Sequence, residues 1–190
     1  MIRQLMTVAA AGAIVVCLQS SVFAQAQTNG ANAPLPQLFR LNVPQNITIT
    51  CPDVLVEQNH DDTDTDQVFP TQTWEVKGNA QPGVTVTFQL TGPFVLTTGS
   101  GLNHQMRDAS LDINIASTQG PAIWTGSATN IASNITAGTA PPLYTATSNG
   151  VGRAYFDLDM TFVNYLGLNG YGSYEEGVYE TTVIGTVTSN

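Results

Sequence analysis

Strict alternation of apolar and polar residues is the feature of this 190-residue chain that most restricts its fold. In the clearest run, Val84, Val86, Phe88 and Leu90 alternate with three polar residues. Successive side chains of a β-strand point to opposite faces, so this run predicts a strand with one buried and one wet face. Similar runs occupy residues 47–51, 72–76, 111–115, 156–162 and 178–188. No 3.6-residue periodicity accompanies them, and the sequence therefore predicts an all-β protein.

Turn-forming residues separate these runs. Gly78-Asn79 and Pro82-Gly83 precede Val84, and they predict a hairpin between the strand at 72–76 and the strand that starts at Val84. Half-polar strands at this density are typical of antiparallel sheets that bury one face each. We expect a single antiparallel, immunoglobulin-like β-sandwich. The aromatic residues expected in its core are Trp74, Phe88, Phe156 and Phe162.

The first 24 residues have the organisation of a cleaved signal peptide. Arg3 gives a positive start, residues 5–18 are almost uncharged and apolar, and Ala24 ends a candidate cleavage site, with a second candidate site at Ala26. The apolar run is too short to span a bilayer comfortably. We therefore expect a signal peptide at 1–24, a flexible leader at 25–36 and the β-sandwich at 37–190, with no integral membrane segment in the mature chain. The expected location is the periplasm, the extracellular space or the cell surface.

Charge restricts the partners of the chain. It has 14 Asp and Glu against 5 Lys and Arg, and one of the basic residues, Arg3, leaves with the signal peptide. Such an acidic chain lacks the electrostatic footprint that binds nucleic acid. Nucleic acid is therefore excluded as an expected partner.

Cysteine content excludes an internal disulfide. Cys17 lies in the signal peptide, which leaves Cys51 as the one cysteine of the mature chain. Its neighbours Ile47 and Ile49 favour a buried, small apolar side chain at Cys51. A bridge between two chains or a reactive thiol is the alternative.

The most acidic segment contains a candidate calcium site. Asp62, Asp64 and Asp66 have the one-three-five spacing that opens a calcium loop. Gln67 stands where an EF-hand has Gly, and Thr73 stands where it has a bidentate Glu, so an EF-hand is rejected. Two interpretations stay open: a looser calcium site in which these three residues share the ion with ligands from another loop, and a solvated acidic loop between strands.

Tyrosines in a glycine-containing segment form a second candidate site. Tyr171 and Tyr174 lie among Gly170, Gly172 and Gly177. Tyrosine on such a loop can stack on a sugar or anchor a protein contact, and it can equally cover the end of a sandwich. We treat Tyr171 and Tyr174 as candidate ligand-binding residues.

Evidence for an enzyme is weak. Asp157 and Asp159 share one strand face, about 7 Å apart by strand rise, and a carboxylate pair can serve glycoside hydrolysis. Alternating polar positions on a wet sheet face explain the same pair. We expect no catalytic residues and no certain cofactor, with calcium as the one candidate.

Two segments carry a family resemblance. Residues 172–188, a Gly-Ser-Tyr step followed by a strand rich in Thr and Val, and residues 78–88 resemble small bacterial secreted β-sandwich proteins of the cell-surface and fimbria-associated kind. The two segments cover about a quarter of the mature chain, and the chain lacks the cysteine pair and the penultimate aromatic residue of chaperone-assembled pilins. The resemblance implies a surface or matrix role without enzymatic activity, and it transfers no functional residues.

Together these observations predict a bacterial, non-enzymatic, secreted or cell-surface protein with a structural or adhesive role. Its expected partners are further copies of itself, other surface proteins or polysaccharide. The first alternative is a calcium-dependent carbohydrate-binding module, and the weaker alternative is a hydrolase.

Overall fold

A computed structural model describes residues 37–98, 106–127, 130–164 and 175–190. The predicted signal peptide and leader, and Tyr171 and Tyr174, lie outside these residues. Residues 37–42 belong to a separate unit and have no regular secondary structure, whereas the unit Val43–Asn190 holds all the described strands. A search of the described residues finds no helix capable of crossing a membrane.

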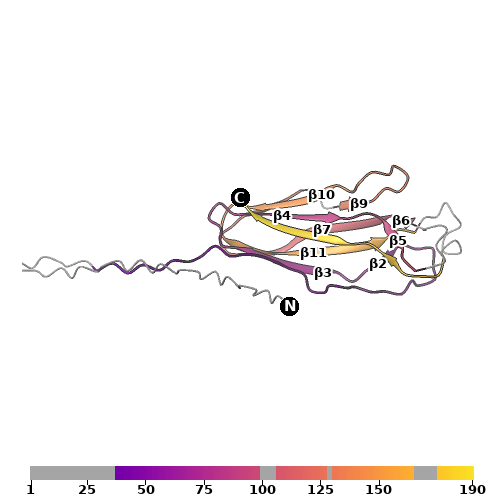
Figure 1. Cartoon of the computed structure of the whole chain (residues 1–190), viewed down its shortest axis with the longest axis horizontal. Helices are drawn as coiled ribbons and strands as arrows, with labels where there is room; N and C mark the ends of the chain where they lie inside the picture. The colour runs from indigo at the N-terminus through magenta and orange to yellow at the C-terminus, as the bar shows by residue number, and fades with distance from the viewer. Residues whose placement is uncertain (1–36, 99–105, 128–129, 165–174) are drawn as a thin grey trace, which may run out of the picture. The chain divides into compact units, whose positions relative to one another are not determined.

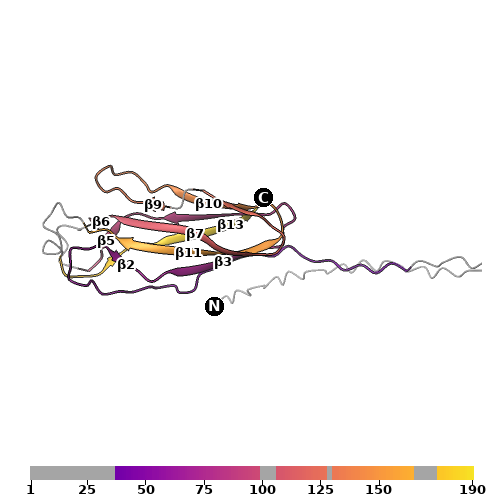
Figure 2. The same ribbon diagram turned by 180° about the vertical axis from the view of Figure 1, so that it is seen from behind.

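Antiparallel sheets packed against one another make up the unit Val43–Asn190 (Figures 1 and 2). The six-stranded sheet has the order β1 (Ile47–Thr50), β3 (Gln72–Gly78), β11 (Gly152–Phe162), β7 (Ala109–Gln119) and β9 (Asn130–Ala132), and β2 (Gln67–Val68) also pairs with β11. The four-stranded sheet has the order β13 (Val183–Ser189), β4 (Val84–Leu90), β10 (Leu143–Ser148) and β8 (Trp124–Gly126). A small sheet contains β12 (Tyr179–Glu180), β5 (Phe94–Leu96) and β6 (Met106–Arg107). The prediction of an all-β antiparallel sandwich is confirmed, and its immunoglobulin-like character stays a prediction.

The apolar faces of the alternating strands form the core between the sheets. Val84, Val86, Phe88 and Leu90 of β4 are at most 1% exposed. The Phe88 ring centroid lies 5.4 Å from that of Phe156 in the opposite sheet. The predicted core aromatics are confirmed: Phe88, Phe156 and Phe162 are buried, and Trp74 is half-buried against the core.

The predicted hairpin between β3 and β4 is wrong. The two strands belong to different sheets, and the turn between them carries the chain across the sandwich. A Cβ on Gly78 would lie 2.6 Å from Val84 Cγ1, and a Cβ on Gly83, whose φ is +93°, would lie 2.0 Å from the carbonyl oxygen of Ser148. The glycines that suggested a tight reversal instead permit this close crossing. Crossing lets β3 and β4 bury their apolar faces against each other, which a hairpin within one sheet would not.

The predicted strand at 178–188 is two strands in two sheets. Tyr179 in β12 pairs with Leu96, and the chain then enters the four-stranded sheet as β13. At the junction the Thr181 hydroxyl donates to the carbonyl oxygen of Gly92, at 2.8 Å. The Tyr179 ring packs edge-on against Phe162, at 5.7 Å between centroids. The alternation continues through the junction, so the sequence pattern did not reveal the change of sheet.

One side of the sandwich closes where β1 meets β13. Val183 and Val187 are half-buried and pack against the core, as their shared strand face predicts. Between them, a Cβ on Gly185 would lie 2.6 Å from Trp74 Cζ3 and 2.8 Å from Ile49 Cδ1. Absence of a side chain at Gly185 therefore allows this side to close. Cys51, just after β1, is half-buried and unbonded, so the prediction of a buried thiol is only partly right.

Candidate functional site

Cross-strand register places a row of polar side chains on the outer face of the six-stranded sheet. Lys77 of β3 lies opposite Arg153 of β11, and Arg153 lies opposite Gln119 of β7. Thr48 of β1 lies on the other side of Lys77. Directly opposed residues in antiparallel strands share a face, so the two cations stand side by side.

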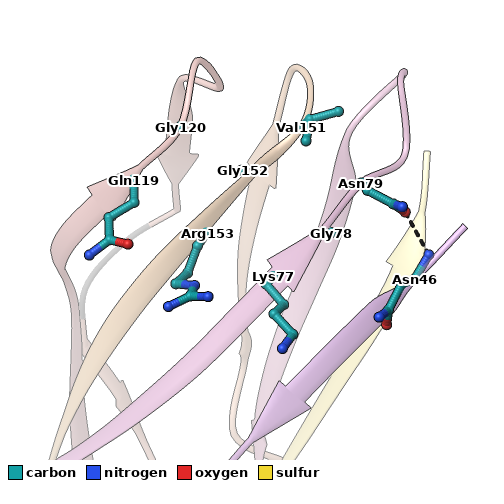
Figure 3. Close-up of a pocket in the computed structure, with 9 residues that line it drawn as sticks. All are labelled: Asn46, Lys77, Gly78, Asn79, Gln119, Gly120, Val151, Gly152 and Arg153. Carbon is teal, nitrogen blue, oxygen red and sulfur yellow. Dashed lines mark hydrogen bonds between the residues drawn. The ribbon is translucent and has the colours of Figure 1, made fainter. Parts of the chain in front are cut away.

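This row borders a shallow groove with a volume of about 360 Å³ at one end of the sheet. Figure 3 shows Lys77, Arg153 and Gln119 side by side on neighbouring strands, with Val151 pointing away from them. Neither Asp nor Glu is among the residues that line the groove. Its polar lining consists of Asn46, Lys77, Asn79, Gln119 and Arg153, and backbone at Gly78, Gly120 and Gly152 completes it.

Neighbouring side chains hold the Arg153 guanidinium in place. Its Nη1 donates to the Tyr155 hydroxyl at 3.1 Å, and its Nε lies 2.9 Å from Glu75 Oε1. The Tyr155 hydrogen bond and, second, the Glu75 charge raise the pKa of Arg153 further above its ordinary value. The Lys77 side chain is exposed and has no hydrogen bond or ion pair with another described residue. The groove thus combines a positioned guanidinium with an ammonium that has no anionic partner within the described part of the chain.

Hydrogen bonds also fix the amide side of the groove. Asn79 Oδ1 accepts from the backbone N–H of Asn46 at 2.5 Å, and Asn79 Nδ2 donates to the carbonyl oxygen of Pro44 at 2.8 Å. The segment before β1 is therefore tied to the turn after β3 (Figure 3). This contact sets one wall of the groove.

The carboxylates considered for hydrolysis lie further along the same strands. Asp157 accepts from the Thr73 hydroxyl at 2.6 Å, and Asp159 accepts from the Thr71 hydroxyl. Asp159 also lies opposite Asp112 of β7. Six residues of strand separate Asp159 from Arg153, a distance of roughly 20 Å. The outer face therefore carries its cations at one end and this carboxylate group towards the other.

Asp61, rather than its acidic neighbours, organises the acidic loop. One Asp61 carboxylate oxygen accepts from the Thr63 hydroxyl at 2.6 Å, from the Thr63 N–H at 3.0 Å and from Gln67 Nε2 at 2.7 Å. The Thr63 hydroxyl hydrogen bond is the main reason that the pKa of Asp61 is lowered from 3.8. Asn164 Nδ2 donates to the carbonyl oxygens of Thr63 and Thr65, and these bonds tie the loop to the end of β11. The loop is thus ordered by its own hydrogen bonds.

The three predicted calcium ligands have separate surroundings in this loop. Asp66 Oδ1 accepts from the backbone N–H of Asn164 at 2.7 Å. Asp62 is exposed and has a φ of 60°, and Asp64 is exposed. Across residues 37–98, 106–127, 130–164 and 175–190, the acidic, His and Cys side chains form no group of three or more that could hold a metal ion. Calcium binding at Asp62, Asp64 and Asp66 stays a prediction, and so does ligand binding at Tyr171 and Tyr174.

An apolar segment before β1 was missed from sequence. Phe39, Leu41 and Val43 are 82%, 87% and 73% exposed. They alternate with Arg40 and Asn42, and this period-2 pattern could have predicted an extended segment with one apolar face. In an extended conformation Phe39, Leu41 and Val43 lie on the same face of this segment, and that face is apolar.

No protein-family model, curated protein or solved structure matches the chain. Fold-level similarity therefore contributes nothing to the assignment of function. The function has to be argued from the residues themselves.

Proposed function

We propose that this protein is a non-enzymatic, secreted or cell-surface structural protein that assembles with further copies of itself through strand addition. The observation that carries the proposal is the exposed apolar alternation of Phe39, Leu41 and Val43. Soluble proteins seldom leave such a face open unless it serves an interaction. An extended segment with one apolar face is the form of ligand that adds to a free sheet edge.

The edge of β13 that faces away from β4 is suited to receive this segment, because β1 packs beside it without pairing to it in a sheet. Charged residues and proline are the features that block unwanted pairing at sheet edges. The seven residues of β13 include neither. The hydrogen bonds that flank the strand identify which backbone groups are unpaired. Thr182 accepts from Thr91 N–H, and Asn190 donates to the Gly83 carbonyl, so even-numbered residues bond to β4.

The N–H groups of Val183, Gly185 and Val187 consequently face away from β4. In an added-strand assembly they would bond to the incoming segment of another copy. Hydrogen exchange tests this directly, since these three amides should gain protection on assembly. The even-numbered amides of Ile184 and Thr186 should be protected in monomer and assembly alike, and they serve as internal controls.

Substitutions in the exposed apolar segment that contains Phe39, Leu41 and Val43 provide the second test. Phe39→Asp combined with Leu41→Asp should abolish assembly in size-exclusion chromatography with light scattering and in electron microscopy of the exported protein. Leu38→Asp is the matched control, because Leu38 is 80% exposed but lies on the other face of an extended segment. An exported protein that stays monomeric at high concentration would overturn the proposal, as would equal effects of the two variants.

A calcium-dependent carbohydrate-binding module is the second candidate. The observation that favours it is the acidic loop, which its own hydrogen bonds hold in a defined form and which leaves Asp62 and Asp64 at the surface. Calcium at about ten times its dissociation constant would stabilise the fold by roughly 1.4 kcal/mol. The melting temperature should then rise by a few degrees.

Magnesium is the control for this candidate, because it gives up its waters reluctantly and should stabilise less. Asp64→Asn combined with Asp66→Asn should remove the calcium effect. Asparagine keeps an acceptor oxygen for the Asn164 N–H, so the loop should stay folded. Equal effects of calcium and magnesium would identify the loop as a solvated turn.

A further inference from the structure

Placement of the two cations on β3 and β11 is unexpected in this chain. It carries a formal net charge of −9 and only 5 Lys and Arg, yet Lys77 and Arg153 are direct cross-strand neighbours. Like charges in directly opposed positions destabilise a sheet. Glu75 pairs with Arg153 alone, at 2.9 Å, and leaves the ammonium of Lys77 uncompensated among the described residues.

An anionic ligand in the groove would compensate this charge. The groove lining contains Lys77 and Arg153 and neither Asp nor Glu. When the Glu75 charge is set against Arg153, one positive charge remains, opposite in sign to that of the chain as a whole. Glu75 and Tyr155 fix the guanidinium through Nε and Nη1, and they leave Nη2 available. A guanidinium held in one orientation binds a carboxylate with little further loss of side-chain entropy.

We infer that this groove binds the carboxylate of an acidic saccharide, with Lys77 and Arg153 as the anion contacts and Gln119 as a contact for hydroxyl groups. The groove is shallow and open, so its charged and polar contacts, rather than enclosure, would hold the ligand. Amides both donate and accept hydrogen bonds, as hydroxyl-rich ligands require. An open groove at the end of a sheet also admits one unit of a polymer whose neighbours remain in solvent.

The affinity should depend strongly on salt. The groove is open and its cations are exposed or half-exposed, so added salt screens their attraction for the ligand. The negative charge of the rest of the chain opposes approach of any polyanion. Binding should therefore weaken as NaCl rises, and it should concentrate at the groove rather than spread over the surface.

Nuclear magnetic resonance titration of the exported protein with tetragalacturonate tests the inference, at a protein concentration where it is monomeric. We expect saturable shifts of the backbone amides of Lys77, Gln119 and Arg153. Lys77→Gln should weaken binding at least about tenfold, and Arg153→Gln should do the same. Arg40→Gln removes the same charge outside the groove, and it should change the affinity less than twofold.

Two further probes define the ligand class. A neutral galactose tetramer should not bind, because it lacks the carboxylates. A sulfated saccharide that binds as tightly as tetragalacturonate would overturn carboxylate recognition in favour of general polyanion binding. Absence of saturable shifts, shifts scattered over the surface, or equal losses in Lys77→Gln and Arg40→Gln would overturn the site. Lys77 is exposed, so a melting temperature unchanged by Lys77→Gln will show that its effect is not due to unfolding.

Discussion

Replacing Phe88 by Ala tests whether β4 joins the two sheets as described. Phe88 is fully buried, and its ring centroid lies 5.4 Å from Phe156, 5.5 Å from Trp74 and 6.1 Å from Tyr144. Phe156 and Trp74 belong to the six-stranded sheet, whereas Tyr144 belongs to the four-stranded sheet. Truncation at Phe88 therefore removes contacts on both sides of the core at once.

The expected cost follows from this environment. Deletion of a buried phenyl group typically destabilises a protein by about 3–5 kcal/mol, through lost transfer free energy and a residual cavity. Because three aromatic rings surround the position and cannot all collapse into the space, we expect the upper part of this range. For a unit of this size, a loss of about 4–5 kcal/mol should lower the melting temperature by roughly 8–20 °C.

Urea unfolding of the protein measures the effect, with the m-value expected to stay unchanged. The matched control is Thr87→Ala, the next residue of β4 on the outer face. Thr87 lies between Thr145 and Thr186, and its loss should cost no more than about 1 kcal/mol. Equal and small losses in Phe88→Ala and Thr87→Ala would refute the described placement of the core.

Two further predictions concern the closing side of the sandwich and the acidic loop. Gly185→Ala should destabilise the fold by roughly 1–3 kcal/mol, because a Cβ there would lie 2.6 Å from the Trp74 indole; Gly150→Ala, where a Cβ meets no atom within 4 Å, should have little effect in the same unfolding assay. In the loop, the lowered pKa of Asp61 means that its contribution to stability is present above pH 3.8 and is lost as the pH falls through the folded-state pKa. Thr63→Val removes the main cause, so carboxyl titration by nuclear magnetic resonance should show the pKa of Asp61 rising towards 3.8, whereas Thr73→Val should leave it unchanged.

The period-2 pattern predicted strand bounds most accurately where every residue on one face of the strand is buried. The predicted run at Val84–Leu90 has the bounds of β4, because every inward residue is apolar and fully buried. β10 was missed for the opposite reason. Its inward positions are Tyr144, Ala146 and Ser148, and the Ser148 hydroxyl accepts from the backbone N–H of Val84. A polar residue thus fills a core position through a specific hydrogen bond, which periodicity does not detect.

Local sequence signals also could not predict which strands pair with each other. The turn between β3 and β4 has the residues of a hairpin, but pairing depends on which apolar faces meet across the core. The same limit hid the candidate groove. Lys77 and Arg153 are remote in sequence, and alternation predicts only that each lies on a wet face. Their adjacency comes from the pairing of β3 with β11, which no short motif encodes.

The strand edge proposed for assembly and the two cations lie on different sheets, although Gln45, next to the groove residue Asn46, donates to the Ser189 hydroxyl of β13 at 3.1 Å. Separate variants therefore test the two proposals. β13 borders the four-stranded sheet, whereas Lys77 and Arg153 stand on the outer face of the six-stranded sheet. Phe39→Asp combined with Leu41→Asp should therefore abolish assembly and leave the affinity for tetragalacturonate unchanged. Lys77→Gln should weaken saccharide binding and leave assembly intact, as judged by light scattering. Loss of both properties in either variant would mean that strand addition and saccharide binding share one surface.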